Sequence, residues 1–133
     1  MGIEQKLTTY FSKQTEVIAV YLFGSYAKGC SRANSDMDLA VLCDSDYGKE
    51  ELFRLELKYF RELSKIIAKN LDIVLLNQAG ELLVYEIVSK GRLIYQRNPR
   101  KRVDFEARRI SDYLEFAPMM NRMINGMMNK LKE

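Results

Sequence analysis

The chain has 133 residues, 47% of them hydrophobic and 29% charged, as in an ordinary folded domain. It contains no histidine, which excludes Ser-His-Asp and Cys-His catalysis and zinc sites with histidine ligands. Cys30 and Cys43 lack metal-site spacing, no apolar run reaches membrane-spanning length, and the N-terminus lacks the apolar core of a signal peptide. We therefore expect a cytoplasmic protein with free thiols and no membrane contact.

The net charge of +3 is distributed unevenly along the chain. Residues 1–96 carry 12 basic and 13 acidic side chains, whereas residues 97–133 carry 9 basic and 5 acidic ones. The first part is therefore not a general polyanion binder, and direct binding to nucleic acid is not expected. The basic excess belongs to the C-terminal segment, where such charges most often form a solvated helix face.

Hydrophobic periodicity predicts helices and strands that alternate along the chain. In chain order, we expect a helix at 3–13, strands at 17–23 and 37–43, a helix at 49–69, a strand at 71–76, a helix at 81–90, a strand at 92–96, and a long helix at 101–132, bent or broken around Pro118. The alternation predicts an α+β domain with α/β-type layering, in which helices cover one face of a small mixed β-sheet. Residues 1–98 are expected to form its core and 99–133 a C-terminal helical extension of the same domain.

Three aspartates mark the starts of two predicted strands. Side chains alternate across a strand, so Asp36 and Asp38 point to the same face, with Cα atoms about 7 Å apart. Asp72 joins that face if the strand at 71–76 lies beside the strand at 37–43. Oxygen ligands without histidine or thiolate favour Mg²⁺ or Mn²⁺, and three carboxylates suit a two-metal site for phosphoryl transfer. A structural ion site, or an Asp72 paired with a base such as Lys69, is the alternative.

A phosphate-binding turn is predicted directly after the first strand. Gly24 lets the backbone turn tightly and approach a phosphate, and the Ser25 hydroxyl can bind a phosphate oxygen. The segment from Ser25 to Lys28 can begin a helix that directs free N–H groups at an anion, and Lys28 adds a positive charge. A Gly-Ser pair by itself is most often only a turn. The prediction of phosphate binding therefore depends on the position of this pair ahead of the aspartates.

The runs Leu-Phe-Gly-Ser-Tyr-Ala-Lys-Gly at 22–29 and Asn-Ser-Asp-Met-Asp-Leu-Ala-Val at 34–41 place Gly-Ser ten residues before Asp-x-Asp. This pattern resembles the signature of the DNA polymerase β-like nucleotidyltransferase superfamily. The short length resembles that of its minimal nucleotidyltransferase (MNT) group. The resemblance covers roughly residues 17–96, including the runs at 71–76 and 91–95, so the core expected at 1–98 would be a nucleotidyltransferase fold.

The resemblance implies a role for each residue of the motif. Asp36 and Asp38 would hold two metal ions, Mg²⁺ or Mn²⁺. Asp72 would be the third carboxylate, holding the metal at the attacking oxygen or taking its proton. Gly24 and Ser25 would hold the triphosphate; many relatives carry arginine at the position of Lys28.

MNT proteins of this size resemble the antitoxin half of HEPN–MNT toxin–antitoxin pairs. This resemblance implies a HEPN-domain ribonuclease toxin as partner, and transfer of AMP from ATP to a tyrosine hydroxyl of that toxin as the reaction. Two alternatives stay open. In the first, the chain neutralises its partner by binding alone. In the second, the chain modifies a small molecule such as an aminoglycoside, although relatives of that kind usually carry an added substrate domain.

The C-terminal helix carries an apolar stripe in which five of the seven methionines of the chain fall at residues 119–128. With Phe116, Ile124 and Leu131 they recur at helical spacing. The stripe either packs back on the chain's own sheet or binds a partner subunit or a second copy of the chain, since methionine adapts to irregular surfaces. The sequence leaves this choice open.

Overall fold

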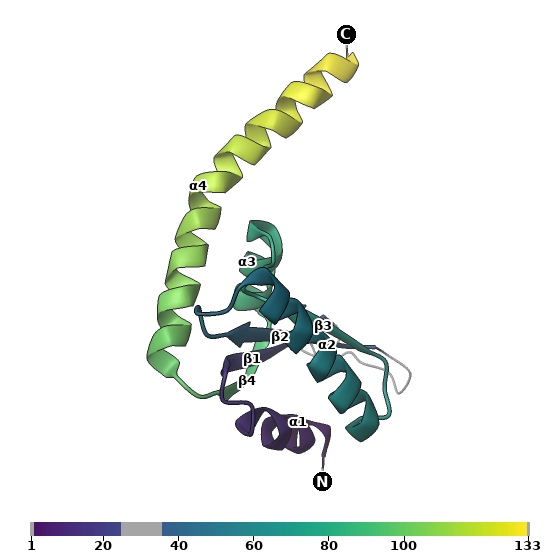
Figure 1. The fold of residues 1–133 in the computed structure, drawn as a ribbon. Coiled ribbons are helices and arrows are strands. Elements are labelled where there is room, and N and C mark those ends of the chain that lie inside the picture. The colour runs from purple at the N-terminus through teal and green to yellow at the C-terminus, as the bar shows by residue number, and fades with distance from the viewer. Residues whose placement is uncertain (1, 25–35, 133) are drawn as a thin grey trace.

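The structure is a computed structural model that describes residues 2–24 and 36–132. Its elements, in chain order, are α1 (Ile3–Ser12), β1 (Val17–Phe23), β2 (Met37–Cys43), α2 (Lys49–Ile66), β3 (Leu71–Leu75), α3 (Glu81–Lys90), β4 (Arg92–Gln96) and α4 (Pro99–Lys132). Figure 1 shows a small central sheet surrounded by helices, with the C-terminal part of α4 extending away from the rest of the molecule. None of the described helices combines the length and the hydrophobicity that a membrane span requires.

The four strands form one sheet in the order β3-β2-β1-β4. β1 is antiparallel to both β2 and β4, whereas β2 and β3 are parallel and are connected through α2. β1 and β2 lie in the middle of the sheet, and nearly all of their side chains are buried. This burial on both faces explains why the two strands appear in the sequence as continuous apolar runs.

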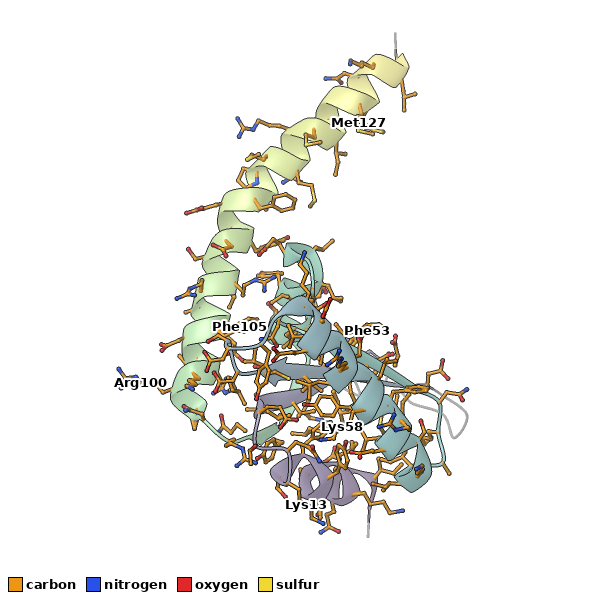
Figure 2. The ribbon with its side chains drawn as sticks, in the orientation of Figure 1. Lys13, Phe53, Lys58, Arg100, Phe105 and Met127 are labelled. Atoms are coloured by element: carbon orange, nitrogen blue, oxygen red, sulfur yellow. The ribbon has the colours of Figure 1, made fainter. Side chains whose placement is uncertain are left out.

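Each face of the sheet has its own hydrophobic core. On the first face, α1 and α2 pack Phe11, Tyr59 and Leu63 against the strands. On the second face, α3 contributes Ile87, and α4 contributes Phe105, which Figure 2 shows directed from the helix toward the sheet. The two cores enclose β1 and β2, so these strands form the rigid base from which the site residues extend.

The predicted α+β class with a small mixed sheet and a long C-terminal helix is confirmed. The expectation that helices cover only one face is wrong. The side chains of β1 and β2 are apolar on both faces of the sheet, so each face is covered by helices. The helix expected to continue to residue 69 ends at Ile66. Ile67 turns to an extended conformation (φ −115°, ψ 122°) and buries its side chain in the first core.

Helix α4 is continuous through Pro118, so of the two expected outcomes, a bend or a break, the break does not occur. A proline inside a helix lacks an N–H donor and crowds the carbonyl one turn earlier, which bends the helix without ending it. Figure 1 shows that α4 changes direction about midway along its length. The part before the bend lies against α3 and the sheet, and the part after it has no neighbouring element among the described residues.

Polar contacts fix the first half of α4 to the domain. The Tyr21 hydroxyl on β1 donates a hydrogen bond to Glu106 at 2.5 Å, and Glu106 also accepts from Arg102 at 2.9 and 3.0 Å. Arg109 donates to the backbone carbonyl of Ala79 at 2.7 Å and pairs with Glu81 at 3.4 Å. Arg109 thereby ties α4 to the loop between β3 and α3, which follows the strand carrying Asp72.

The contribution of Arg109 can be measured by unfolding. Arg109→Ala removes the donor of the Ala79 carbonyl from a largely buried position, so we expect the free energy of unfolding to fall by about 1–3 kcal/mol. Arg108→Ala removes an exposed arginine next to Arg109 and should change the free energy of unfolding by less than about 0.5 kcal/mol. Urea unfolding of both variants tests this, and equal losses would contradict the role of Arg109.

Candidate active site

The structure locates four of the six residues singled out in the sequence. Gly24 follows the last residue of β1, Asp36 directly precedes β2, Asp38 is the second residue of β2, and Asp72 is the second residue of β3. Ser25 and Lys28 lie outside the described residues. The described part of the motif is therefore gathered where β1 ends and where β2 and β3 begin.

The register of the sheet brings two of the aspartates together. Asp38 and Asp72 are direct partners in the parallel pairing of β2 with β3, and adjacent strands are about 4.8 Å apart. Asp38 lies between Met37 and Leu39, which are buried in the first core, so it points to the second face of the sheet. Asp72 points the same way, because its neighbours in β3 are also buried in the first core. The expectation that Asp72 shares a face with Asp38 is confirmed.

The electrostatics of Asp38 reflect this crowding. Burial raises the pKa of its carboxyl group, and the negative charges of Asp72 and Asp36 raise it further. Asp72 and Asp36 are both exposed, so solvent or a ligand can reach the group from the side of these two residues. A half-buried carboxylate held against two others is a position that favours a cation.

Glu56 is a fourth carboxylate whose charge interacts with that of Asp72, and the sequence motif does not include it. Burial and the charge of Asp72 raise the pKa of Glu56, which lies half-buried on α2. Its signal in the sequence is its position: Glu56 falls in the buried stripe formed by Leu52, Tyr59 and Leu63, where an apolar residue would be expected. A polar residue in such a stripe is more informative than an exposed one, because burial of a carboxylate is unfavourable without a compensating role.

Gly24 has a conformation and surroundings that only glycine fits. Its φ of +71° lies in the left-handed region, which is unfavourable for residues with a Cβ atom. A Cβ atom added to Gly24 would lie 2.5 Å from Oδ2 of Asp38. The backbone at the end of β1 therefore lies directly against the Asp38 carboxylate, so a ligand held by this carboxylate also meets the turn after β1.

The carboxylates fit a hard divalent cation whose coordination shell is completed by substrate phosphates and water. In residues 2–24 and 36–132, no group of three or more acidic or cysteine side chains is close enough to hold a metal ion by itself. Mg²⁺ is usually held by one or two carboxylates together with substrate phosphates and water, so a full protein shell is not required. The raised pKa of Asp38 is the observation that fits a cation here, since a positive charge would relieve the repulsion among the aspartates.

Two hollows are lined by residues that neighbour the aspartates in the chain or in space. One, of about 180 Å³, lies beside Gly24 and is lined by Phe23, Gly24, Leu83, Glu86, Ile87, Lys90 and Gly91. The other, of about 190 Å³, is lined by Glu56, Val74, Leu75, Gln78, Ala79 and Leu83. Val74 follows Asp72 on the same face of β3, and Leu83 on α3 forms part of both walls. The site thus has one side next to the turn after β1 and another next to β3 and α2.

Comparison with known families shows to which family the chain belongs. The family described as polymerase beta, nucleotidyltransferase matches residues 5–100, which include all of the described site residues. The chain belongs to the polymerase beta nucleotidyltransferase family. The match to this nucleotidyltransferase includes all four strands, α2, α3 and most of α1.

Individual relatives agree with this assignment. The nucleotidyltransferase is 33% identical over 76 residues to a protein adenylyltransferase, MntA, of Shewanella oneidensis; the match covers 57% of this chain and 52% of that protein. The chain thus spans about half the length of this curated relative. Its fold is similar to that of a toxin–antitoxin structure with AMP-PNP, with a TM-score of 0.77 at 24% identity over 96% of this chain and 99% of the other.

A second solved structure has the same fold. It is described as a tri-AMPylated Shewanella oneidensis HEPN toxin in complex with MNT antitoxin, and its matching chain has a TM-score of 0.66 at 22% identity. The match covers 95% of this chain and 99% of the other, so it includes the long C-terminal helix as well as the sheet. At this level of identity the likeness establishes the fold of the nucleotidyltransferase.

Substitution of Gly24 tests the contact between the turn and Asp38. Gly24→Ala should lower the free energy of unfolding by about 1–2 kcal/mol, because alanine is strained at this φ and its methyl group displaces the Asp38 carboxylate. Gly126→Ala is the control, since nothing lies within 4 Å of a Cβ at Gly126, and this change inside α4 should raise the free energy of unfolding by up to about 1 kcal/mol. Chemical denaturation measures both, and a Gly24→Ala variant as stable as wild type would contradict this close approach.

The pKa of Asp38 predicts a pH-dependent effect of Asp38→Asn in the absence of divalent cations. Because the pKa is raised in the folded state, the folded protein binds this proton more tightly than the unfolded chain does, and ionisation lowers stability. Asp38→Asn should therefore unfold at a higher temperature than wild type at neutral pH. The difference should shrink as the pH falls and vanish below about 3.8, the ordinary pKa of the group.

Thermal unfolding followed by circular dichroism at a series of pH values measures this difference. Asp46→Asn, in the exposed loop before α2, is the control and should show no such gain at neutral pH. A lower unfolding temperature for Asp38→Asn than for wild type at neutral pH would contradict the repulsion inferred at this site.

Proposed function

We propose that this nucleotidyltransferase transfers AMP from ATP to a tyrosine hydroxyl of a partner protein, a HEPN-domain toxin, and thereby acts as an antitoxin. The observation that carries the proposal is the direct pairing of Asp38 with Asp72, with the backbone of Gly24 against the Asp38 carboxylate. This arrangement joins a cation-binding pair of carboxylates to a turn suited to phosphate. The name of the Shewanella relative, a protein adenylyltransferase, supports AMP as the group transferred and a protein as its acceptor.

The proposed chemistry is an in-line displacement at the α-phosphorus of ATP. The tyrosine oxygen forms a bond to the α-phosphorus, the bond from that phosphorus to the bridging oxygen breaks, and pyrophosphate leaves with the bridging electrons. The Asp72 carboxylate, which is exposed, accepts the proton of the tyrosine hydroxyl. Asp36, Asp38 and Asp72 would hold two divalent cations, Mg²⁺ or Mn²⁺, which supply charge stabilisation when bound.

The two hollows suggest where the substrates bind. The hollow beside Gly24 would receive the nucleotide, with Gly24 and Ser25 holding the triphosphate and Lys28 adding a positive charge. The hollow beside Glu56 and Val74 would receive the acceptor tyrosine, because it lies on the side of Asp72, the proposed proton acceptor. Its apolar walls suit a phenol ring, and the Glu56 and Gln78 side chains are available as polar partners.

We further propose that residues 1–98 form the catalytic core and that 99–133 are a helical extension of the same domain. The family match to residues 5–100 and the contacts of Phe105 and Arg109 with the core support this division. One observation favours a second function, neutralisation by binding alone. Large apolar side chains are exposed along the end of α4, as on a surface that binds another protein.

Transfer of radiolabelled AMP to a co-purified HEPN toxin separates the two functions. Asp38→Asn and Asp72→Asn should each lower kcat/KM at least about a hundredfold, because each removes several kcal/mol of transition-state stabilisation. Asp46→Asn, an exposed aspartate away from the site, is the matched control and should transfer normally. If the two site variants transfer AMP as fast as wild type, the proposed catalytic site is wrong. If Asp38→Asn and Asp72→Asn transfer no AMP but still relieve toxicity, neutralisation is by binding.

A further inference from the structure

Four residues lie in a row across the sheet, at the end of the strands that carries the proposed site. The strand order is β3-β2-β1-β4, and β3, β2 and β4 begin where β1 ends. Asp72 lies at this end on β3, Asp38 on β2 and Gly24 after β1, while Lys90 is the last residue of α3 and comes just before β4. Because neighbouring strands are about 4.8 Å apart, the row runs from Asp72 to Lys90 across the width of the sheet. Helix α3 packs on the second face, to which Asp38 and Asp72 also point.

The pairing of β1 with β4 brings Lys90 next to the turn after β1. In this antiparallel pair Leu22 is the partner of Arg92. Continued by two residues, the same register leads to Gly24 on one side and to Lys90 on the other, and both residues line the same hollow of about 180 Å³. A Cβ atom on Gly91 would collide with the backbone of α3 and lie 3.1 Å from the carbonyl oxygen of Leu22. The absence of a side chain at Gly91 therefore lets the end of α3 approach the end of β1.

Lys90 is the only basic residue among the described residues that line the two hollows of the site. The other charged residue of the hollow beside Gly24 is Glu86, and the charged residue of the hollow beside β3 is Glu56. With the three aspartates, these carboxylates make the described part of the site acidic, whereas the triphosphate of ATP is itself an anion. A positive charge next to Gly24 offsets the repulsion between the triphosphate and these carboxylates.

The ammonium group of Lys90 has a partner that a phosphate can replace. Its Nζ pairs with a carboxylate oxygen of Glu86 at 2.9 Å, one turn earlier on α3. The side chain of Lys90 is 64% exposed and that of Glu86 44%, so this ion pair contributes little to the stability of the domain. A phosphate offers several charged acceptor oxygens where Glu86 offers one carboxylate. Lys90 can therefore exchange Glu86 for a phosphate without loss of the fold.

We propose that Lys90 binds the β- and γ-phosphates of ATP and stabilises the pyrophosphate as it leaves, an inference that rests on the proposed function. In an in-line displacement the attacking oxygen and the leaving group lie on opposite sides of the α-phosphorus. Asp72, the proposed proton acceptor, lies at one end of the row and Lys90 at the other, with Asp38 and Gly24 between them. No bond forms to Lys90, and its ammonium group keeps its proton throughout the step.

The test measures binding of α,β-methylene-ATP, which cannot be cleaved at the α-phosphorus, to the full chain by calorimetry with Mg²⁺. Lys90→Ala should raise the dissociation constant at least about tenfold, because it removes a charged hydrogen-bond donor from the phosphates. Lys90→Arg keeps the charge and should bind within about threefold of wild type. AMP lacks the β- and γ-phosphates, so Lys90→Ala should change its dissociation constant less than about threefold. Lys65→Ala removes an exposed lysine from the last turn of α2 and is the matched control.

Glu86→Gln separates phosphate binding from a structural role of the ion pair. It breaks the same ion pair as Lys90→Ala, so a purely structural pair would give both variants the same affinity for the analogue. We expect opposite shifts, because Glu86→Gln frees the ammonium group and removes a negative charge from the hollow. Glu86→Gln should therefore bind the analogue about two- to fivefold more tightly than wild type. Thermal unfolding should show that both variants are as stable as wild type.

The outcomes distinguish failure of this inference from failure of the proposed function. If wild type binds the analogue, Asp38→Asn weakens this binding and Lys90→Ala does not, Lys90 has no such role while the nucleotide site stands. Equal losses of affinity for AMP and for the analogue in Lys90→Ala would also contradict contact with the β- and γ-phosphates. If wild type does not bind the analogue, the nucleotide site itself is wrong, and the role of Lys90 is wrong with it.

Discussion

The parallel pairing of β2 with β3 is the constraint on which the site depends. In this register Asp38 lies directly opposite Asp72, and a shift by one residue would turn one of the two carboxylates into the first core. The register is itself held by buried neighbours, because Leu39 and Ile73 must point into that core. The apolar packing on the first face thus fixes the polar arrangement on the second, and α2 provides both the connection between the strands and the Glu56 carboxylate.

The site is formed at the expense of local stability. Burial and the other aspartates raise the pKa of Asp38, and a carboxylate occupies a position of α2 that packing alone would give to an apolar side chain. Gly24 adds a backbone conformation that other residues rarely adopt, next to the same carboxylate. Natural proteins accept such conflicts mainly where function requires them, so their coincidence around Asp38 is an argument for chemistry at this point.

The sequence predicted much of the fold because its strands and helices have strong hydrophobic patterns. The eight elements were expected close to their actual positions, and the shared face of Asp38 and Asp72 followed from alternation once the strands were taken as neighbours. The sequence analysis did not predict helices on both faces of the sheet, because continuous apolar runs in β1 and β2 do not reveal which helix packs on which face. Glu56 was missed because its closeness to Asp72 depends on how α2 lies across the sheet, and such tertiary placement leaves only a weak trace in the sequence.

The two halves of helix α4 have different surroundings. Arg109 fixes its first half to the loop that follows β3, and the Tyr21–Glu106–Arg102 contacts fix it to β1, the strand that ends at Gly24. The first half of α4 is therefore attached to β1 and to the loop that follows β3, next to the paired aspartates. The exposed apolar side chains at the end of α4 do not stabilise the described domain, because no element of that domain covers them. The same helix thus closes the second face of the sheet with its first half and leaves the apolar side chains of its second half uncovered.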